Sequence, residues 1–232
     1  MEHNSYLSQE QIEDIQINFI NKVFGYMSLA LLITALFAFI VSNSPLLLYA
    51  IYSNKIVFFG LIIGEFFMVR HLSKNVYKMN STKAFTMFVL YSILNGITLS
   101  YIFKLYTSSS IVSTFLVASV TFLTMSFIGF KTQSDLTKFS KLFSMALMGI
   151  IIASLANFLL QSSAVTYVVT YFGLFLFIGL VAYDTQKLKY LSIASYEDES
   201  LSGNLAIIGA LSLYLDFINI FLFLLRIFGD RD

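Results

Sequence analysis

Seven long apolar stretches constrain what this chain can fold into, because each is long enough to cross a lipid bilayer as a helix. The hydrocarbon core of a bilayer takes about 20 residues of helix. The composition agrees, since 58% of the residues are hydrophobic and 12% are charged, against about 25% charged residues in soluble domains. We therefore predict an all-α membrane protein with seven transmembrane helices. The predicted spans are residues 21–42, 54–72, 84–105, 110–130, 142–161, 165–189 and 204–228.

The chain before the first span predicts a cytoplasmic N-terminal segment, residues 1–20, ahead of a transmembrane domain over residues 21–232. This segment is polar and acidic, whereas a cleaved signal begins with positive charge followed by an apolar run. We therefore expect the first apolar helix to remain in the mature protein.

Lysine and arginine gather on one side of the predicted spans, which favours a cytoplasmic N-terminus and an external C-terminus. Ten of the fourteen basic residues then face the cytoplasm. This bias supports an odd number of spans and predicts a multi-pass integral membrane protein. The ten are Lys22, Arg70, Lys74, Lys78, Lys83, Lys131, Lys138, Lys141, Lys187 and Lys189.

Several function classes are excluded or disfavoured by composition. The net charge of +1 gives no basic surface for nucleic acid. The absence of cysteine excludes disulfides and zinc–cysteine sites. The sequence has no His-Glu-x-x-His and no Gly-x-Ser-x-Gly motif, which are signatures of metalloproteases and serine hydrolases. We expect no enzyme activity and no permanently bound cofactor.

Three acids lie inside predicted spans, where an ionisable group is costly unless it faces a protein interior or a water-filled cavity. They are Glu65 in the second span, Asp184 in the sixth and Asp216 in the seventh. Glu65 and Asp184 fall toward the inner ends of their spans. Asp216 lies about 18 Å along its helix from Asn204 at 1.5 Å per residue. These depths allow the acids to meet in the inner half of the membrane.

The last span carries a polar stripe in an otherwise apolar helix. The spacing of its residues by three, four or seven positions places them on one face, which indicates a bundle interior. The stripe consists of Gly209, Ser212, Asp216, Asn219 and Arg226. Smaller stripes occur at Tyr91, Asn95 and Thr98 and at Ser154, Asn157 and Gln161.

Two carboxylates in contact cannot both ionise cheaply, so such a pair shares a proton and can titrate near physiological pH. Their oxygens are also ligands for Ca²⁺. This chemistry makes Asp184 and Asp216 a predicted pH switch or a cation site that suits Ca²⁺. Other roles stay open at this point. Asp184 could be a hydrated acid beside Lys187 and Lys189, and Asp216 could hydrogen-bond to Asn219 and Ser212. Glu65 could pair with Arg70.

Three motifs resemble the Bax inhibitor-1 family, also called the transmembrane BAX inhibitor motif family. Residues 210–221, which read ALSLYLDFINIF, strongly resemble its seventh-helix signature. Tyr183-Asp184-Thr185-Gln186 and Asn95-Gly96-Ile97-Thr98-Leu99 resemble its sixth-helix and third-helix motifs. The similarity extends over nearly the whole chain and is greatest to the bacterial branch, which implies a protein of the bacterial inner (plasma) membrane.

The resemblance implies a central seventh helix and a pH-sensitive calcium leak. Asp184 and Asp216 would then share a proton and hold the inner mouth shut until deprotonation loosens them. Glu65, Ser212 and Asn219 are expected along the ion pathway. Arg70 is the expected latch on the aspartates, although it follows Glu65 by five residues where the family has about eleven. The implied partners are the lipid bilayer, Ca²⁺, protons and a membrane protease.

Two functions from different classes therefore compete. The first is a cation leak channel or slow transporter gated by Asp184 and Asp216. The second is a non-conducting membrane regulator that binds a membrane protease or another membrane protein, with the polar stripe serving only in helix packing. Ion flux in liposomes distinguishes them.

Overall fold

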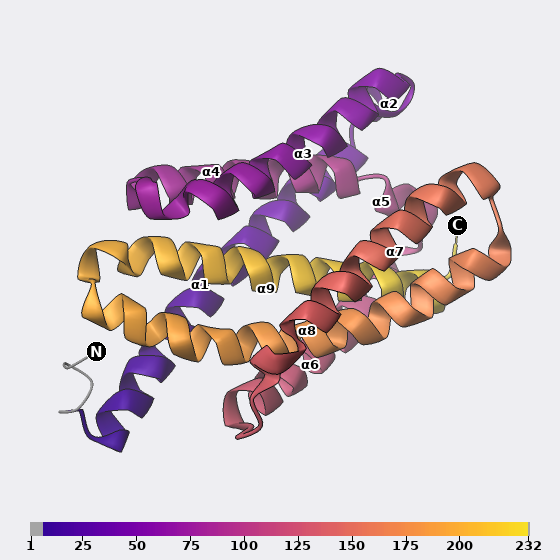
Figure 1. Cartoon of the computed structure of the whole chain (residues 1–232). Coiled ribbons are helices and arrows are strands. Elements are labelled where there is room, and N and C mark those ends of the chain that lie inside the picture. The colour runs from indigo at the N-terminus through magenta and orange to yellow at the C-terminus, as the bar shows by residue number, and fades with distance from the viewer. Residues whose placement is uncertain (1–6, 232) are drawn as a thin grey trace. The chain divides into compact units, whose positions relative to one another are not determined.

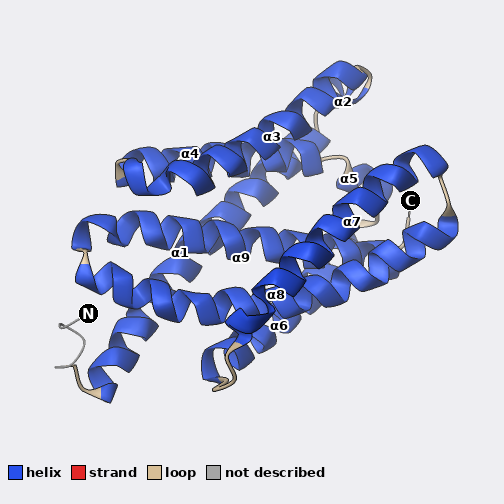
Figure 2. Ribbon diagram, viewed as in Figure 1, coloured by secondary structure: helices blue, strands red, loops and turns tan. Residues whose placement is uncertain are grey.

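The computed structural model describes residues 7–231, and within that range the chain is helical with no strand (Figure 2). Short turns join consecutive helices. The elements are α1 (Gln9–Ser42), α2 (Pro45–Tyr52), α3 (Lys55–Asn75), η2 (Val76–Lys78), α4 (Ser81–Leu99), α5 (Ile102–Leu105), α6 (Ser108–Lys131), η3 (Leu136–Phe139), α7 (Ser140–Leu160), α8 (Ser163–Glu197) and α9 (Glu199–Phe228).

Within the described residues, seven helical segments are long and apolar enough to cross a membrane, which confirms the predicted count. Several helices are longer than their predicted spans. α1 begins at Gln9, α8 continues to Glu197, and α9 begins at Glu199. Residues 1–6 of the predicted N-terminal segment lie outside the described residues. The central position of the last helix stays a prediction, although its most apolar window is 67% buried, against 39% or less in the other six.

Local sequence signals explain where the helices begin. Ser8 precedes α1 and forms a capping box with Gln11, which satisfies backbone N–H groups that have no partner inside the helix. Ser44 caps α2, and Pro45 occupies its first turn, where the missing N–H of proline costs nothing. Asn54 and Asn80 cap α3 and α4 in the same way.

The chain divides into two compact units, which we describe separately. Unit 1 contains the chain up to Thr107 and Leu188–Tyr214. Unit 2 contains Ser108–Lys187 and Leu215–Arg231. Both α8 and α9 contribute residues to each unit.

Unit 1 is built around α4, which packs against α1 and α3. Figure 1 shows α3 and α4, in violet and magenta, running alongside each other. The α1–α4 contact is close at Gly96, because a Cβ atom there would lie 2.5 Å from the carbonyl oxygen of Thr34. The absent side chain therefore permits the two helix backbones to approach.

Asn204, near the start of α9, holds the η2 turn within unit 1. Its side chain is 2% exposed, and its Nδ2 donates to the carbonyl oxygens of Val76 at 2.8 Å and Met79 at 2.7 Å. These two bonds connect segments far apart in sequence. We infer that Asn204 fixes the turn that follows α3.

We expect Asn204→Ala to lower the free energy of unfolding by about 1–3 kcal/mol, because it removes both side-chain hydrogen bonds from α9 to the η2 turn and leaves the Met79 carbonyl without its Asn204 donor. Thermal unfolding in detergent measures the change. Asn21→Ala is the matched control, because Asn21 is exposed on α1 and should shift stability by less than about 0.5 kcal/mol. Equal melting temperatures for the two variants would contradict the assignment.

Unit 2 packs α6 closely against α8. A Cβ atom on Gly129 would overlap the backbone of Ala182, whose carbonyl oxygen is its nearest neighbour. Phe217, from the α9 segment of this unit, stacks edge-on with Phe115 and Phe122 of α6. Such aromatic pairs add about 0.5–1.5 kcal/mol to area burial. The α8 and α9 segments that carry Asp184 and Asp216 thus both pack against α6 in unit 2.

Candidate functional site

Asp184 on α8 and Asp216 on α9 meet within unit 2. Their carboxyl groups lie within hydrogen-bonding reach of each other. The predicted depths allowed this contact but did not establish it. Asp216 does not use the alternative partners weighed from the sequence, because the Asn219 Nδ2 donates instead to the carbonyl oxygen of Leu215 at 2.8 Å.

The environments of the two acids differ. Asp216 is 4% exposed, and its Oδ2 is buried without a hydrogen-bond partner among the described residues. Asp184 is half-buried and interacts electrostatically with Lys187, which is exposed. The pair therefore combines a half-buried acid near one lysine with an acid that is buried inside the unit.

A hydrogen bond between two carboxyl groups requires a proton, because two carboxylates are both acceptors. The contact can thus exist in a singly protonated form and is repelled when both groups are ionised. The unpartnered Oδ2 of Asp216 adds a second chemical property. A buried, unsatisfied acceptor is costly and calls for a donor or a cation.

The motif around Asp184 also holds the loop between α6 and α7. Gln186 Oε1 accepts from the Leu136 N–H at 2.8 Å, and its Nε2 donates to the Ser134 carbonyl oxygen at 2.8 Å. The Tyr183 hydroxyl donates to Ser140 Oγ at 3.1 Å. These bonds anchor α8 immediately beside Asp184. The sequence motif identified the residues but did not reveal this positioning role.

The other polar residues of the seventh-span stripe have separate surroundings. Ser212 is half-buried and belongs to unit 1. Arg226 is exposed, and its Nη1 donates to Thr170 Oγ1 at 3.3 Å. The stripe thus contributes to helix packing as well as to the acid pair. The roles of Ser212 and Asn219 in an ion pathway stay predictions.

Glu65 forms a second acidic site, half-buried within unit 1. Its carboxylate accepts from Thr98 Oγ1 at 2.5 Å and Asn95 Nδ2 at 3.4 Å. The two donors belong to the α4 stripe noted in the sequence. Within residues 7–231, no basic side chain forms an ion pair with Glu65. The open alternative of a Glu65–Arg70 pair is therefore not the arrangement in this structure.

The Glu65 site extends to α1 and α9 through hydroxyl groups. The Tyr214 hydroxyl donates to Asn95 Oδ1 at 3.1 Å and lies 2.7 Å from Thr34 Oγ1. Thr34 in turn donates to the carbonyl oxygen of Ser92 at 3.0 Å. Sequence reasoning missed Tyr214 and Thr34, because a tyrosine in an apolar helix reads as core and a lone threonine carries no pattern.

We expect Tyr214→Phe to destabilise the chain by about 1–3 kcal/mol, because the buried Asn95 Oδ1 loses its donor. The ring contacts with Phe88 and Tyr91 remain in this variant. Tyr49→Phe is the control, because Tyr49 is 73% exposed. Thermal unfolding in detergent compares them. A Tyr214→Phe variant as stable as Tyr49→Phe would show that the hydroxyl network contributes nothing.

The predicted latch residue, Arg70, is exposed near the end of α3. In the part of the chain that the structure describes, it forms no hydrogen bond or ion pair. The same residues contain no group of three or more His, Asp or Glu side chains positioned for a metal ion. Both the latch and the calcium site stay predictions.

Comparison with known proteins agrees with the motifs. The model of the family described as "Inhibitor of apoptosis-promoting Bax1" matches residues 16–232. The chain is 46% identical over 211 residues to "Inner membrane protein YbhL" of Escherichia coli (strain K12), covering 90% of each chain. It is 42% identical over 226 residues to an uncharacterized protein of Borreliella burgdorferi, covering 97% of each.

The chain belongs to the Bax inhibitor-1 family. Membership and the seven apolar helices make it a multi-pass integral membrane protein of the bacterial inner membrane. The two aspartates that meet in unit 2 are those of the motifs that resemble this Bax inhibitor-1 family. The direction in which the termini face stays a prediction from charge.

Proposed function

We propose that this protein is a pH-sensitive cation leak, with Ca²⁺ as the conducted ion, gated by Asp184 and Asp216. The observation that carries the proposal is that the carboxyl groups of Asp184 and Asp216, on two apolar helices, lie within hydrogen-bonding reach of each other. An intramembrane acid is costly and marks ion or proton pathways. In this proposal, the two acids hold one proton between them, and the release of that proton opens the path.

The proposed gate works through the charge of the pair. At low pH the shared proton joins Asp184 to Asp216 and keeps α8 and α9 together at this point. As the pH rises the proton is lost, two negative charges repel, and the path loosens. Flux is therefore expected to rise from pH 5 toward pH 8.

The proposed ion ligands are oxygen atoms, as Ca²⁺ prefers. The buried Oδ2 of Asp216 has no hydrogen-bond partner among the described residues. Thr185 Oγ1 and Ser126 Oγ, also in unit 2, are buried without partners in the same sense. Because Ca²⁺ takes 6–8 oxygens, water completes its shell in this proposal. Glu65 is proposed as a further acid on the pathway, and no reaction is catalysed.

The experiment that tests the proposal is Ca²⁺ entry into liposomes holding the purified chain, followed with a trapped dye from pH 5 to 8. We expect protein-dependent entry that increases with pH, and none in protein-free liposomes. Folded protein that passes no ion at any pH would overturn the leak. It would favour the non-conducting regulator that binds a membrane protease or another membrane protein.

A further inference from the structure

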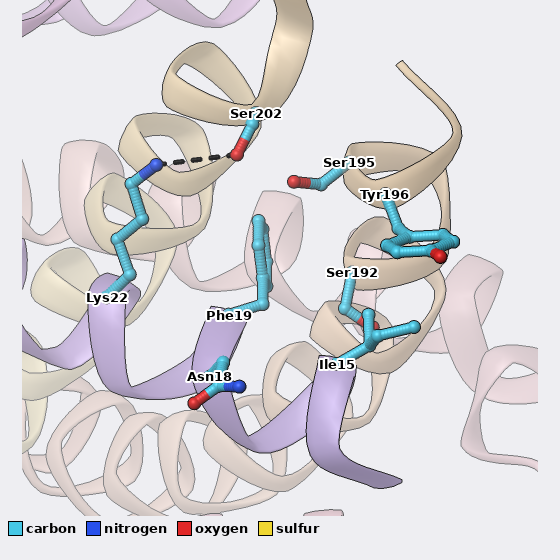
Figure 3. A pocket seen from close by; sticks show the side chains of 8 residues that line it. All are labelled: Ile15, Asn18, Phe19, Lys22, Ser192, Ser195, Tyr196 and Ser202. Atoms are coloured by element: carbon cyan, nitrogen blue, oxygen red, sulfur yellow. Dashed lines mark hydrogen bonds between the residues drawn. The ribbon is translucent and has the colours of Figure 1, made fainter. Parts of the chain in front are cut away.

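A pocket of about 390 Å³ lies within unit 1, and its lining contains no residue of either acidic site (Figure 3). Three helices form its walls. Pockets for small ligands are about 300–1,000 Å³, so a polar headgroup fits this volume. The lining residues are Ile15, Asn18, Phe19 and Lys22 of α1, Ser192, Ser195 and Tyr196 of α8, and Ser202 of α9.

Hydrogen-bond donors line the pocket around the positive charge of Lys22. Lys22 Nζ donates to Ser202 Oγ at 3.4 Å, a long bond that leaves the ammonium other directions. Ser195 is 8% exposed and has no hydrogen-bond partner for its hydroxyl within the described residues. Figure 3 shows that hydroxyl turned toward Lys22 and Ser202. A hydroxyl that lines a pocket on a buried residue and has no partner in the protein can donate to a ligand there.

None of the described residues that line the pocket is an acid. The nearby Asp198, between α8 and α9, directs its Oδ1 to the N–H of Ser200 at 3.0 Å and to its hydroxyl. Asp198 thus caps α9 instead of neutralising Lys22. The helix terminus adds partial positive charge at this end of α9, so the pocket favours an anion.

The remaining walls point to an anion attached to apolar groups. Phe19 and Ile15 provide a hydrophobic surface beside the donors (Figure 3). The pocket lies where α8 ends and α9 begins, between two apolar spans. Basic pockets between transmembrane helices bind phosphate headgroups. We propose that Lys22, Ser195 and Ser202 bind the phosphate of an anionic phospholipid headgroup.

The proposal is tested by native mass spectrometry of the full chain in detergent, titrated with phosphatidylglycerol or phosphatidylcholine and, separately, with inorganic phosphate as competitor. Phosphatidylglycerol should bind more tightly than the zwitterionic lipid. Lys22→Gln and Ser195→Ala should each weaken its binding about tenfold, equivalent to about 1.4 kcal/mol. Elution as a single folded species is checked for every variant, and Ser195→Ala serves if Lys22→Gln does not fold.

Lys83→Gln is the matched control, since Lys83 is exposed, lies outside the pocket and is predicted on the same membrane face. It should leave binding within about twofold, as for a surface charge. Competition by inorganic phosphate without lipid selectivity would support the phosphate chemistry but overturn the lipid as its source. Binding by Lys22→Gln and Ser195→Ala equal to that by Lys83→Gln would overturn the site. None of these outcomes depends on ion flux.

Discussion

Asp216→Asn should abolish the pH dependence of Ca²⁺ entry and hold it at the low level of the protonated wild type. The asparagine Nδ2 donates a hydrogen bond at every pH, so it can reproduce the shared-proton contact with Asp184 permanently. In the wild type that contact is lost when the proton leaves. Flux into liposomes across pH 5 to 8, with equal amounts of folded protein, measures the difference.

Asp135→Asn is the matched control for this variant, because it removes one carboxylate outside the predicted spans. Asp135 accepts hydrogen bonds from the hydroxyl and N–H of Thr137, which hold its pKa below the ordinary value. Asp135 is therefore ionised from pH 5 to 8, and its replacement removes a constant charge. Its flux should keep the wild-type pH profile. A pH response in Asp216→Asn identical to wild type would contradict the gate.

Gly129→Ala should destabilise the chain by about 1–3 kcal/mol, as expected for overpacking. The added Cβ overlaps the Ala182 carbonyl oxygen, and backbone atoms cannot move aside as a flexible side chain can. To make room for the added Cβ, α6 and α8 must move apart at Ala182, which lies two residues before Asp184. A lower melting temperature in detergent is the expected result.

Gly149→Ala provides the opposite case within the same unit. Gly149 lies inside α7, and a Cβ atom there would meet nothing within 4 Å. Because alanine favours a helix over glycine by about 0.5–1 kcal/mol, this variant should match or exceed wild-type stability. Equal stability of the two alanine variants would show that the close approach at Gly129 does not limit packing.

The seven spans could be predicted from sequence because lipid leaves only long apolar helices for such a chain. The ends of the helices were harder to predict from the sequence. Residues 190–197 are polar enough to suggest a connector, yet they continue α8. There Ser192 and Ser195 are buried and line the pocket beside α1. A polarity profile cannot distinguish serines that face a packed helix from serines in a loop.

The acidic residues were identifiable because an acid in an apolar span is unusual, but their partners were not. Asp184 and Asp216 could be placed at compatible depths from 1.5 Å per residue, while their contact depends on how two helices are rotated. The hydrogen-bonding role of the Tyr214 hydroxyl could not be predicted from the sequence for a similar reason. Its place between Thr34 and Asn95 depends on tertiary packing of three helices.

The most direct test of the shared proton is an infrared titration of the carboxyl groups in wild type and Asp216→Asn between pH 5 and 8. We expect one protonated carboxyl signal that disappears from wild type over the pH range in which flux rises, and that is absent from the variant. A wild-type spectrum with no carboxyl titration in that range, or the same titration in both proteins, would contradict gating by Asp184 and Asp216.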